Sequence, residues 1–216
     1  MANTDDNYFD RIISLGQDCG VAGGMRNIGY KECSYPFDWN VTFLEYIFEC
    51  FNNKFSNFDE IFKNSKIGSY GIVNYKNICH FYHDKKHIID KEIIDKYKRR
   101  GKRLNNLLNS SKRILFIRKD KDTKIKDMIL LKELIIKKYP NLKFKILLLN
   151  NDKNEKTNDD YIIHKYIGSD CFLEESNRKP GIFKHTNIKL AYSCVYDELK
   201  NYSSVKFSQP DIRDGN

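Results

Sequence analysis

Residues 113–150 read "RILFIRKDKDTKIKDMILLKELIIKKYPNLKFKILLLN". Its two ends, "RILFIR" (113–118) and "KFKILLLN" (143–150), are short apolar runs that are typical of buried strands. Between them, "KIKDMILLKELIIKKYP" (124–140) has apolar residues at helical spacing and ends at Pro140, which predicts an amphipathic helix. A strand, a helix of this length and a second strand together predict a βαβ unit and a parallel sheet.

The beginning of the chain has the same organisation. "RIISLG" (11–16) predicts a first buried strand, and "DCGVAGGMRNIG" (18–29) predicts a helix that Asp18 can cap and Gly29 can end, although its internal glycines weaken that prediction. The remaining elements are helices over 42–51 and 91–108, a hairpin or two short strands over 67–82, and a strand over 160–167. The expected fold class is therefore α/β, with a largely parallel sheet covered by helices on both faces.

Length and composition indicate one globular domain. The 216 residues are 40% hydrophobic, which suffices for one sizeable core. We expect a single domain over 1–216, with poorly ordered ends at 1–10 and from about residue 200. The N-terminus lacks the features of a secretory signal, and no apolar run reaches the ~18 residues of a membrane span, so we expect a soluble, cytoplasmic protein.

Six cysteines are spread along the chain without a CxxC pair. In a reducing compartment this pattern predicts free thiols, most of which need only a packing explanation. The cysteines are Cys19, Cys33, Cys50, Cys79, Cys171 and Cys194.

The net charge of +9 comes mostly from scattered lysine, so nucleic-acid binding is the weaker explanation of the charge. A dense basic stretch lies within the helix predicted over 91–108 and can meet phosphates of a nucleic acid or a charged ligand, although a solvated lysine-rich face is the ordinary case. Arg99, Arg100 and Arg118 are candidates to bind an anionic group of a substrate, such as a carboxylate or phosphate.

Cys19 lies between the first strand and the first helix, where α/β folds gather their ligands and reactive groups. At the start of a helix, unpaired amides and the helix dipole stabilise a thiolate, and the same amides can hold an oxyanion. The alternative is that Cys19 is a small core residue beside glycines, where bulk does not fit. Position alone does not separate the two interpretations.

Four motifs in order resemble a family catalogued as papain-like cysteine peptidases, which is seen in bacteria and large DNA viruses. They are "ISLGQDCGVAGGMRNIGYKECSYPFDW" (13–39), "FYHD" (81–84), "KYKRRGKRLNNLL" (96–108) and "ILFIR" (114–118). The resemblance covers roughly residues 11 to 120. It implies a papain-like α+β arrangement as the alternative fold.

The resemblance also implies roles for individual residues. Cys19 would be the nucleophile and His83 its base, with Asp38 or Asp84 orienting the histidine. Gln17 would be a candidate oxyanion-hole amide.

Two further motifs allow two interpretations each. In "PFDWN" (36–40), Trp39 either lines a substrate pocket or packs in the hydrophobic core beside a turn. Cys79, His83 and His87 have a spacing that suggests zinc, but a fourth ligand is not evident, so we expect no metal and no cofactor.

The favoured function is a cysteine hydrolase that acts on a peptide, amide or ester. A non-catalytic module that binds an anionic ligand is the second hypothesis, and a nucleic-acid-binding accessory protein is the third. The sequence determines neither the bond that is cleaved nor the oligomeric state.

Overall fold

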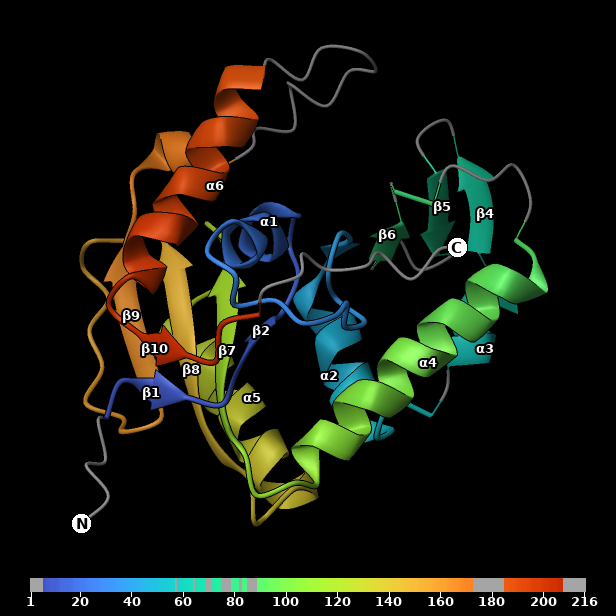
Figure 1. Cartoon of the computed structure of the whole chain (residues 1–216), viewed down its shortest axis with the longest axis horizontal. Helices are drawn as coiled ribbons and strands as arrows, with labels where there is room; N and C mark the ends of the chain where they lie inside the picture. Colours follow the sequence, from blue (N-terminus) through green and yellow to red (C-terminus); the bar gives the residue numbers. More distant parts are fainter. Residues whose placement is uncertain are drawn as a thin grey trace.

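The computed structural model describes residues 6–56, 58–63, 65–68, 71–74, 79–81, 83–84, 89–172 and 185–207 (Figure 1). Its main sheet has four parallel strands in the order β2–β7–β8–β9. The strands are β2 (Arg11–Ser14), β7 (Arg113–Lys119), β8 (Lys143–Asn150) and β9 (Ile162–Tyr166). The α/β class and the parallel sheet predicted from the sequence are confirmed.

Helices cover both faces of this sheet. In β7, Ile114 and Phe116 point into one core, while Leu115 and Ile117 point into the other, as the two-residue period of a strand requires. The first core includes side chains of α2 (Leu44–Asn52), α4 (Lys91–Leu108) and α5 (Ile125–Lys138). The second is closed by α1 (Gly20–Asn27) and α6 (His185–Leu199), which lie together in Figure 1.

A second sheet of four antiparallel strands lies beside α4 (Figure 1). Its order is β3 (Val41–Thr42), β6 (Cys79–Phe81), β5 (Gly71–Asn74) and β4 (Ser65–Gly68), with α3 (Phe58–Lys63) leading into it. The expected hairpin over 67–82 forms part of this sheet. The expectation of a largely parallel fold therefore holds for the main sheet alone. β4, β5 and β6 follow one another closely in the chain, which favours antiparallel pairing, whereas β3 joins β6 across α2 and α3.

The two ends of the described chain lie side by side. β1 (Tyr8–Phe9) pairs in parallel with β10 (Ser203–Ser204), within the stretches expected to be poorly ordered. Residues 1–5 and 208–216 of those stretches lie outside the described residues. Among the helices that the structure describes, none combines the length and the apolar character needed to cross a bilayer.

The prediction that all six cysteines are free thiols is wrong. Cys171, at the end of the short 3-10 helix η1 (Ser169–Cys171), forms a disulfide with Cys194 of α6. The other four cysteines are free. Spacing along the sequence did not reveal the pair because the packing of α6 beside η1, rather than a local motif, brings the two sulfurs together.

Candidate functional site

The candidate site begins where the chain leaves β2 at the carboxyl edge of the parallel sheet. Gly16 and Gln17 both have a positive φ, 76° and 77°, which is uncommon for a glutamine. A Cβ on Gly16 would lie 2.6 Å from Cβ of Thr42 in β3, so the backbone passes too close for any other residue. The turn therefore fixes the direction in which Asp18 and Cys19 leave the sheet. Strained backbone of this kind occurs often at functional sites.

Replacing Gly16 by alanine is expected to lower the free energy of unfolding by about 2–3 kcal/mol, from backbone strain and the contact with Thr42. Gly29 is the matched control, because it has the same φ of 76° and its nearest outside atom would lie 3.5 Å from a Cβ. Gly29→Ala should cost about 1 kcal/mol, from the strain alone. Equal losses for the two variants in urea unfolding would show that the contact with Thr42 is unimportant.

Cys19 is the N-cap residue of α1 and is half-buried. Its neighbour Asp18 accepts a hydrogen bond from the amide of Gly20 at 2.6 Å, which satisfies one free donor of the helix start. On the other side, the hydroxyl of Tyr192 in α6 donates to the Cys19 sulfur at 3.4 Å. Cys19 therefore lies between the beginning of one helix and a phenol from another.

A buried ion pair lies next to this cysteine. Lys119, the last residue of β7, is completely buried, and its Nζ lies 3.1 Å from Oδ2 of Asp18. The same Nζ donates to the carbonyl of Cys171 at 3.0 Å. The ring of Phe172 packs 5.7 Å from the ammonium. Residues from β7 and from the segment after β9 thus converge on the turn that carries Cys19.

The pKa of the Cys19 thiol is raised. Burial is the largest cause, and the negative charge of Asp18 adds to it. The hydrogen bond from Tyr192 and the charge of Lys119 act in the opposite direction, without reversing the shift. These surroundings favour the neutral thiol over the thiolate, so the proton must be taken by a base before the sulfur can attack.

The structure places His83 against Trp39 rather than against the cysteine. The two rings form an edge-on contact with centroids 5.8 Å apart, and His83 is exposed. Trp39 is buried with a φ of 66°, and its indole N–H lies 3.3 Å from the Ser34 hydroxyl. In the part of the chain that the structure describes, the contacts of the Cys19 sulfur and the charges that shift its pKa involve no histidine.

The two candidate acids have partners of their own. Asp38 is fully buried, forms an ion pair with Lys31 and accepts the amide of Tyr35 at 2.6 Å. Asp84 forms an ion pair with Lys96, and its Oδ2 lies 2.7 Å from the hydroxyl of Tyr97. Asp38 thus closes the turn before Trp39, and Asp84 fastens the end of the antiparallel sheet to α4.

The three candidate arginines lie in different surroundings. Arg118 is buried, with its donors directed at groups of the protein. Arg100 is also buried and packs over the Tyr97 ring at 5.1 Å. Arg99 is exposed on α4. The structure does not gather these three side chains into one cluster with Cys19.

Sequence reasoning missed Lys119 and Tyr192. Lys119 follows Arg118 at the end of an apolar strand. A charged residue at that position was the signal in the sequence that could have marked it as a candidate. Tyr192 lies 173 residues after Cys19, and no local pattern links the two. Gln17, the candidate oxyanion-hole residue, is half-buried, and its Oε1 has no hydrogen-bond partner among the described residues.

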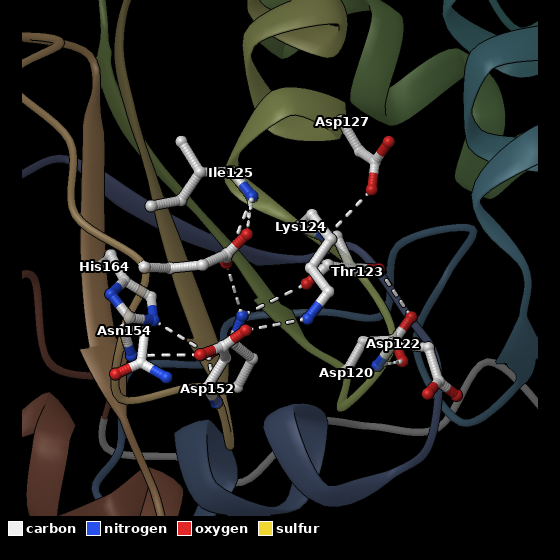
Figure 2. A network of polar contacts seen from close by, with 11 residues as sticks. Asp120, Asp122, Thr123, Lys124, Ile125, Asp127, Asp152, Asn154 and His164 are labelled. Carbon is white, nitrogen blue, oxygen red and sulfur yellow. Dashed lines mark hydrogen bonds and ion pairs between the residues drawn. The ribbon is translucent and has the colours of Figure 1, made fainter.

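A second polar network lies further along the same sheet edge (Figure 2). The amide nitrogen of Asn150 lies 3.2 Å from the carbonyl of Thr123 and 2.9 Å from Glu155. Its oxygen accepts the amide of Asp152 at 3.1 Å and meets Nε2 of His164 at 2.8 Å. The amide group is fully used in joining the loop after β8 to the start of α5, so we assign this network to structure.

Of the suggested zinc ligands, only Cys79 and His83 belong to the part of the chain that the structure describes. His87 lies outside the described residues. Within the described ranges, no group of three or more histidine, cysteine, aspartate or glutamate residues is placed to hold a metal ion.

Comparison with known proteins gives two matches. The family described as "Putative papain-like cysteine peptidase" matches residues 10–154, which include the turn with Cys19, the motif with Trp39 and the parallel strands β2, β7 and β8. "Uncharacterized protein R408" of Acanthamoeba polyphaga mimivirus is 28% identical over 142 residues. That alignment covers 53% of this chain and 62% of the viral protein. No solved structure matches the chain significantly.

Proposed function

The chain belongs to the family described as putative papain-like cysteine peptidases, and from this premise we propose that it is a cysteine hydrolase with Cys19 as its nucleophile. The observation that carries the proposal is the position of Cys19 as the N-cap of α1, at the carboxyl edge of the parallel sheet. In α/β folds this edge is where reacting groups collect. The substrate that the family suggests is a peptide; an amide or ester would react by the same chemistry.

In the proposed reaction, the start of α1 holds the oxyanion that forms when Cys19 attacks. A base takes the thiol proton, the sulfur attacks the substrate carbonyl, and the resulting oxyanion is held by unpaired amides of the first turn of α1. The amine then leaves with the proton, and water hydrolyses the thioester to regenerate the thiol. Tyr192 contacts the sulfur directly, so its hydroxyl would stabilise the thiolate that attacks.

In this proposal His83 is the base, as the family resemblance implies. Its ring would have to leave the contact with Trp39 and approach the sulfur of Cys19 to about 3 Å. Asp38 and Asp84 both have partners inside the protein, so whichever acid orients His83 would have to give up one of them.

The pH dependence of alkylation at each cysteine tests the state of Cys19. Because its pKa is raised, the rate with iodoacetamide should keep rising above pH 9, the ordinary value for a thiol. Tyr192→Phe removes a hydrogen bond that favours the thiolate and should shift the profile further to high pH. His83→Ala should leave the profile of the resting protein unchanged. A plateau near pH 6 that His83→Ala abolishes would instead show a resting thiolate–imidazolium pair and overturn this picture of a neutral thiol.

Hydrolysis itself is tested with a fluorogenic peptide library. Cys19→Ser should abolish cleavage, and His83→Ala should abolish it as well if His83 is the base. Cys33→Ser is the matched control, since Cys33 is also a free, half-buried thiol and should be dispensable. Cleavage that survives in Cys19→Ser would overturn the proposed function.

A further inference from the structure

The disulfide between Cys171 and Cys194 joins a segment that contacts Cys19 to a segment that contacts the ion pair beside it. Cys171 ends η1, which follows the last strand of the parallel sheet, and Cys194 lies in α6. The two residues are 23 positions apart in the sequence.

The segment with Cys194 supplies the group that touches the sulfur. Tyr192 lies two residues before Cys194, and its hydroxyl donates to Cys19 at 3.4 Å. The ring of Tyr192 packs directly against α1, since a Cβ on Gly23 would come within 2.6 Å of it. Tyr192 is therefore one of the side chains that cover Cys19.

The segment with Cys171 contacts the ion pair beside Cys19. The carbonyl of Cys171 accepts a hydrogen bond from Lys119 at 3.0 Å, and Lys119 pairs with Asp18 at 3.1 Å. Phe172 packs over the same ammonium. The disulfide therefore links the helix that carries Tyr192 to the segment that packs against the Lys119–Asp18 ion pair.

The part of α6 after the disulfide has independent anchors. Val195 and Leu199 are fully buried in the core formed with β7 and β8. Tyr192 lies before Cys194, on the other side of the covalent bond from these anchors. Breaking the disulfide removes the covalent tie between this end of α6 and η1, whereas the core end keeps its anchors.

We propose that the disulfide is a redox latch on Cys19. In the oxidised protein, Tyr192 is held against the sulfur of Cys19, and the sulfur stays covered. A dithiol reductant converts the bond to two cysteine thiols and is itself oxidised to a disulfide, which frees Tyr192 to move and uncovers Cys19. The biological meaning of the latch rests on the proposed hydrolase, since it concerns access to the same nucleophile.

Alkylation of Cys19 measures the latch without any substrate. Wild-type protein is treated with dithiothreitol, freed of reductant by anaerobic gel filtration, and reacted with iodoacetamide at pH 7.5 beside untreated protein. Peptide mass spectrometry then gives a rate for each cysteine. We expect Cys19 to react on the order of tenfold faster after reduction. The sulfur becomes accessible to the reagent, and relief of the burial that disfavours the thiolate outweighs the lost hydrogen bond from Tyr192.

Two controls separate uncovering of the site from loss of the fold. Cys50 is buried and free, so it should stay unreactive in both states. The variant Cys171→Ser/Cys194→Ser should show the fast Cys19 rate with or without reductant. An unchanged Cys19 rate on reduction, or a parallel rise at Cys50, would overturn the proposal. If the latch is observed and no peptide is cleaved, the proposed hydrolase fails and the latch stands as a property of the thiol.

Discussion

Replacing Arg118 by methionine is expected to lower the free energy of unfolding by about 3–5 kcal/mol, the usual cost of removing one partner of a buried ion pair. The guanidinium is 1% exposed. Its Nη1 donates to the carbonyls of Leu15 at 2.9 Å and Thr42 at 2.8 Å, and its Nη2 bonds Asp120 at 2.5 Å. One side chain thus joins the end of β2, the strand β3 and the loop after β7.

Loss of Arg118 would leave the carboxylate of Asp120 buried without its ion-pair partner. Burial alone would raise the pKa of this carboxyl, but the charge of Arg118 and the hydroxyl of Thr123 outweigh it and lower the pKa overall. Without the arginine, a buried carboxylate keeps the desolvation cost and loses its main compensation. Methionine fills part of the volume, so the effect reports the polar contacts rather than a cavity.

Chemical unfolding in urea, followed by circular dichroism, measures the loss. Arg99→Met is the control, since Arg99 is exposed on α4 and its replacement should change stability by less than about 0.5 kcal/mol. If Arg118→Met were as stable as Arg99→Met, the internal contacts of Arg118 would not hold the two sheets together, and a role in binding an anionic substrate would become the better explanation.

The parallel sheet could be predicted because its apolar runs are long and regular. The strand expected over 143–150 and the helix expected over 91–108 have the bounds observed for β8 and α4. In both, the hydrophobic period is repeated often enough to decide between helix and strand. The strands of the antiparallel sheet have two to four residues each, which is too short for a period to form.

The surroundings of Cys19 could be predicted only in part. The turn, the glycine and the cysteine are adjacent in sequence, so their position at the carboxyl edge followed from the order of strand and helix. Lys119 and Tyr192 reach the same place from distant parts of the chain, and the latter depends on how α6 packs on α1. Long-range packing of this kind leaves no local pattern.

Charged residues in motifs were the least predictable part of the site. Sequence identifies Asp38 and Arg118 as charged groups among apolar neighbours, where a partner is obligatory. It does not say whether that partner is a substrate or another residue. The structure pairs Asp38 with Lys31 and Arg118 with Asp120, so both side chains have partners inside the protein.

Replacing Lys31 by methionine should be nearly as destabilising as the change at Arg118, at about 3–5 kcal/mol. The side chains of Lys31 and Asp38 are 2% and 0% exposed, and the ammonium also donates to the carbonyl of Cys33 at 2.9 Å. Without the lysine, the buried carboxylate of Asp38 keeps the amide of Tyr35 as its donor on Oδ2. Its Oδ1 has no hydrogen-bond partner among the described residues. The turn that presents Trp39 would then carry an uncompensated charge.

A double-mutant cycle distinguishes this structural role from a catalytic one. Asp38→Asn combined with Lys31→Met removes both charges, so the double variant should be more stable than the sum of the two single losses predicts. Glu32→Gln is the matched control, because the Arg11–Glu32 pair is also in direct contact, at 2.8 Å, but its glutamate is 47% exposed and should contribute less than about 1 kcal/mol. Additive losses at Lys31 and Asp38, together with an altered pH profile of peptide cleavage in Asp38→Asn, would return Asp38 to the role of orienting acid.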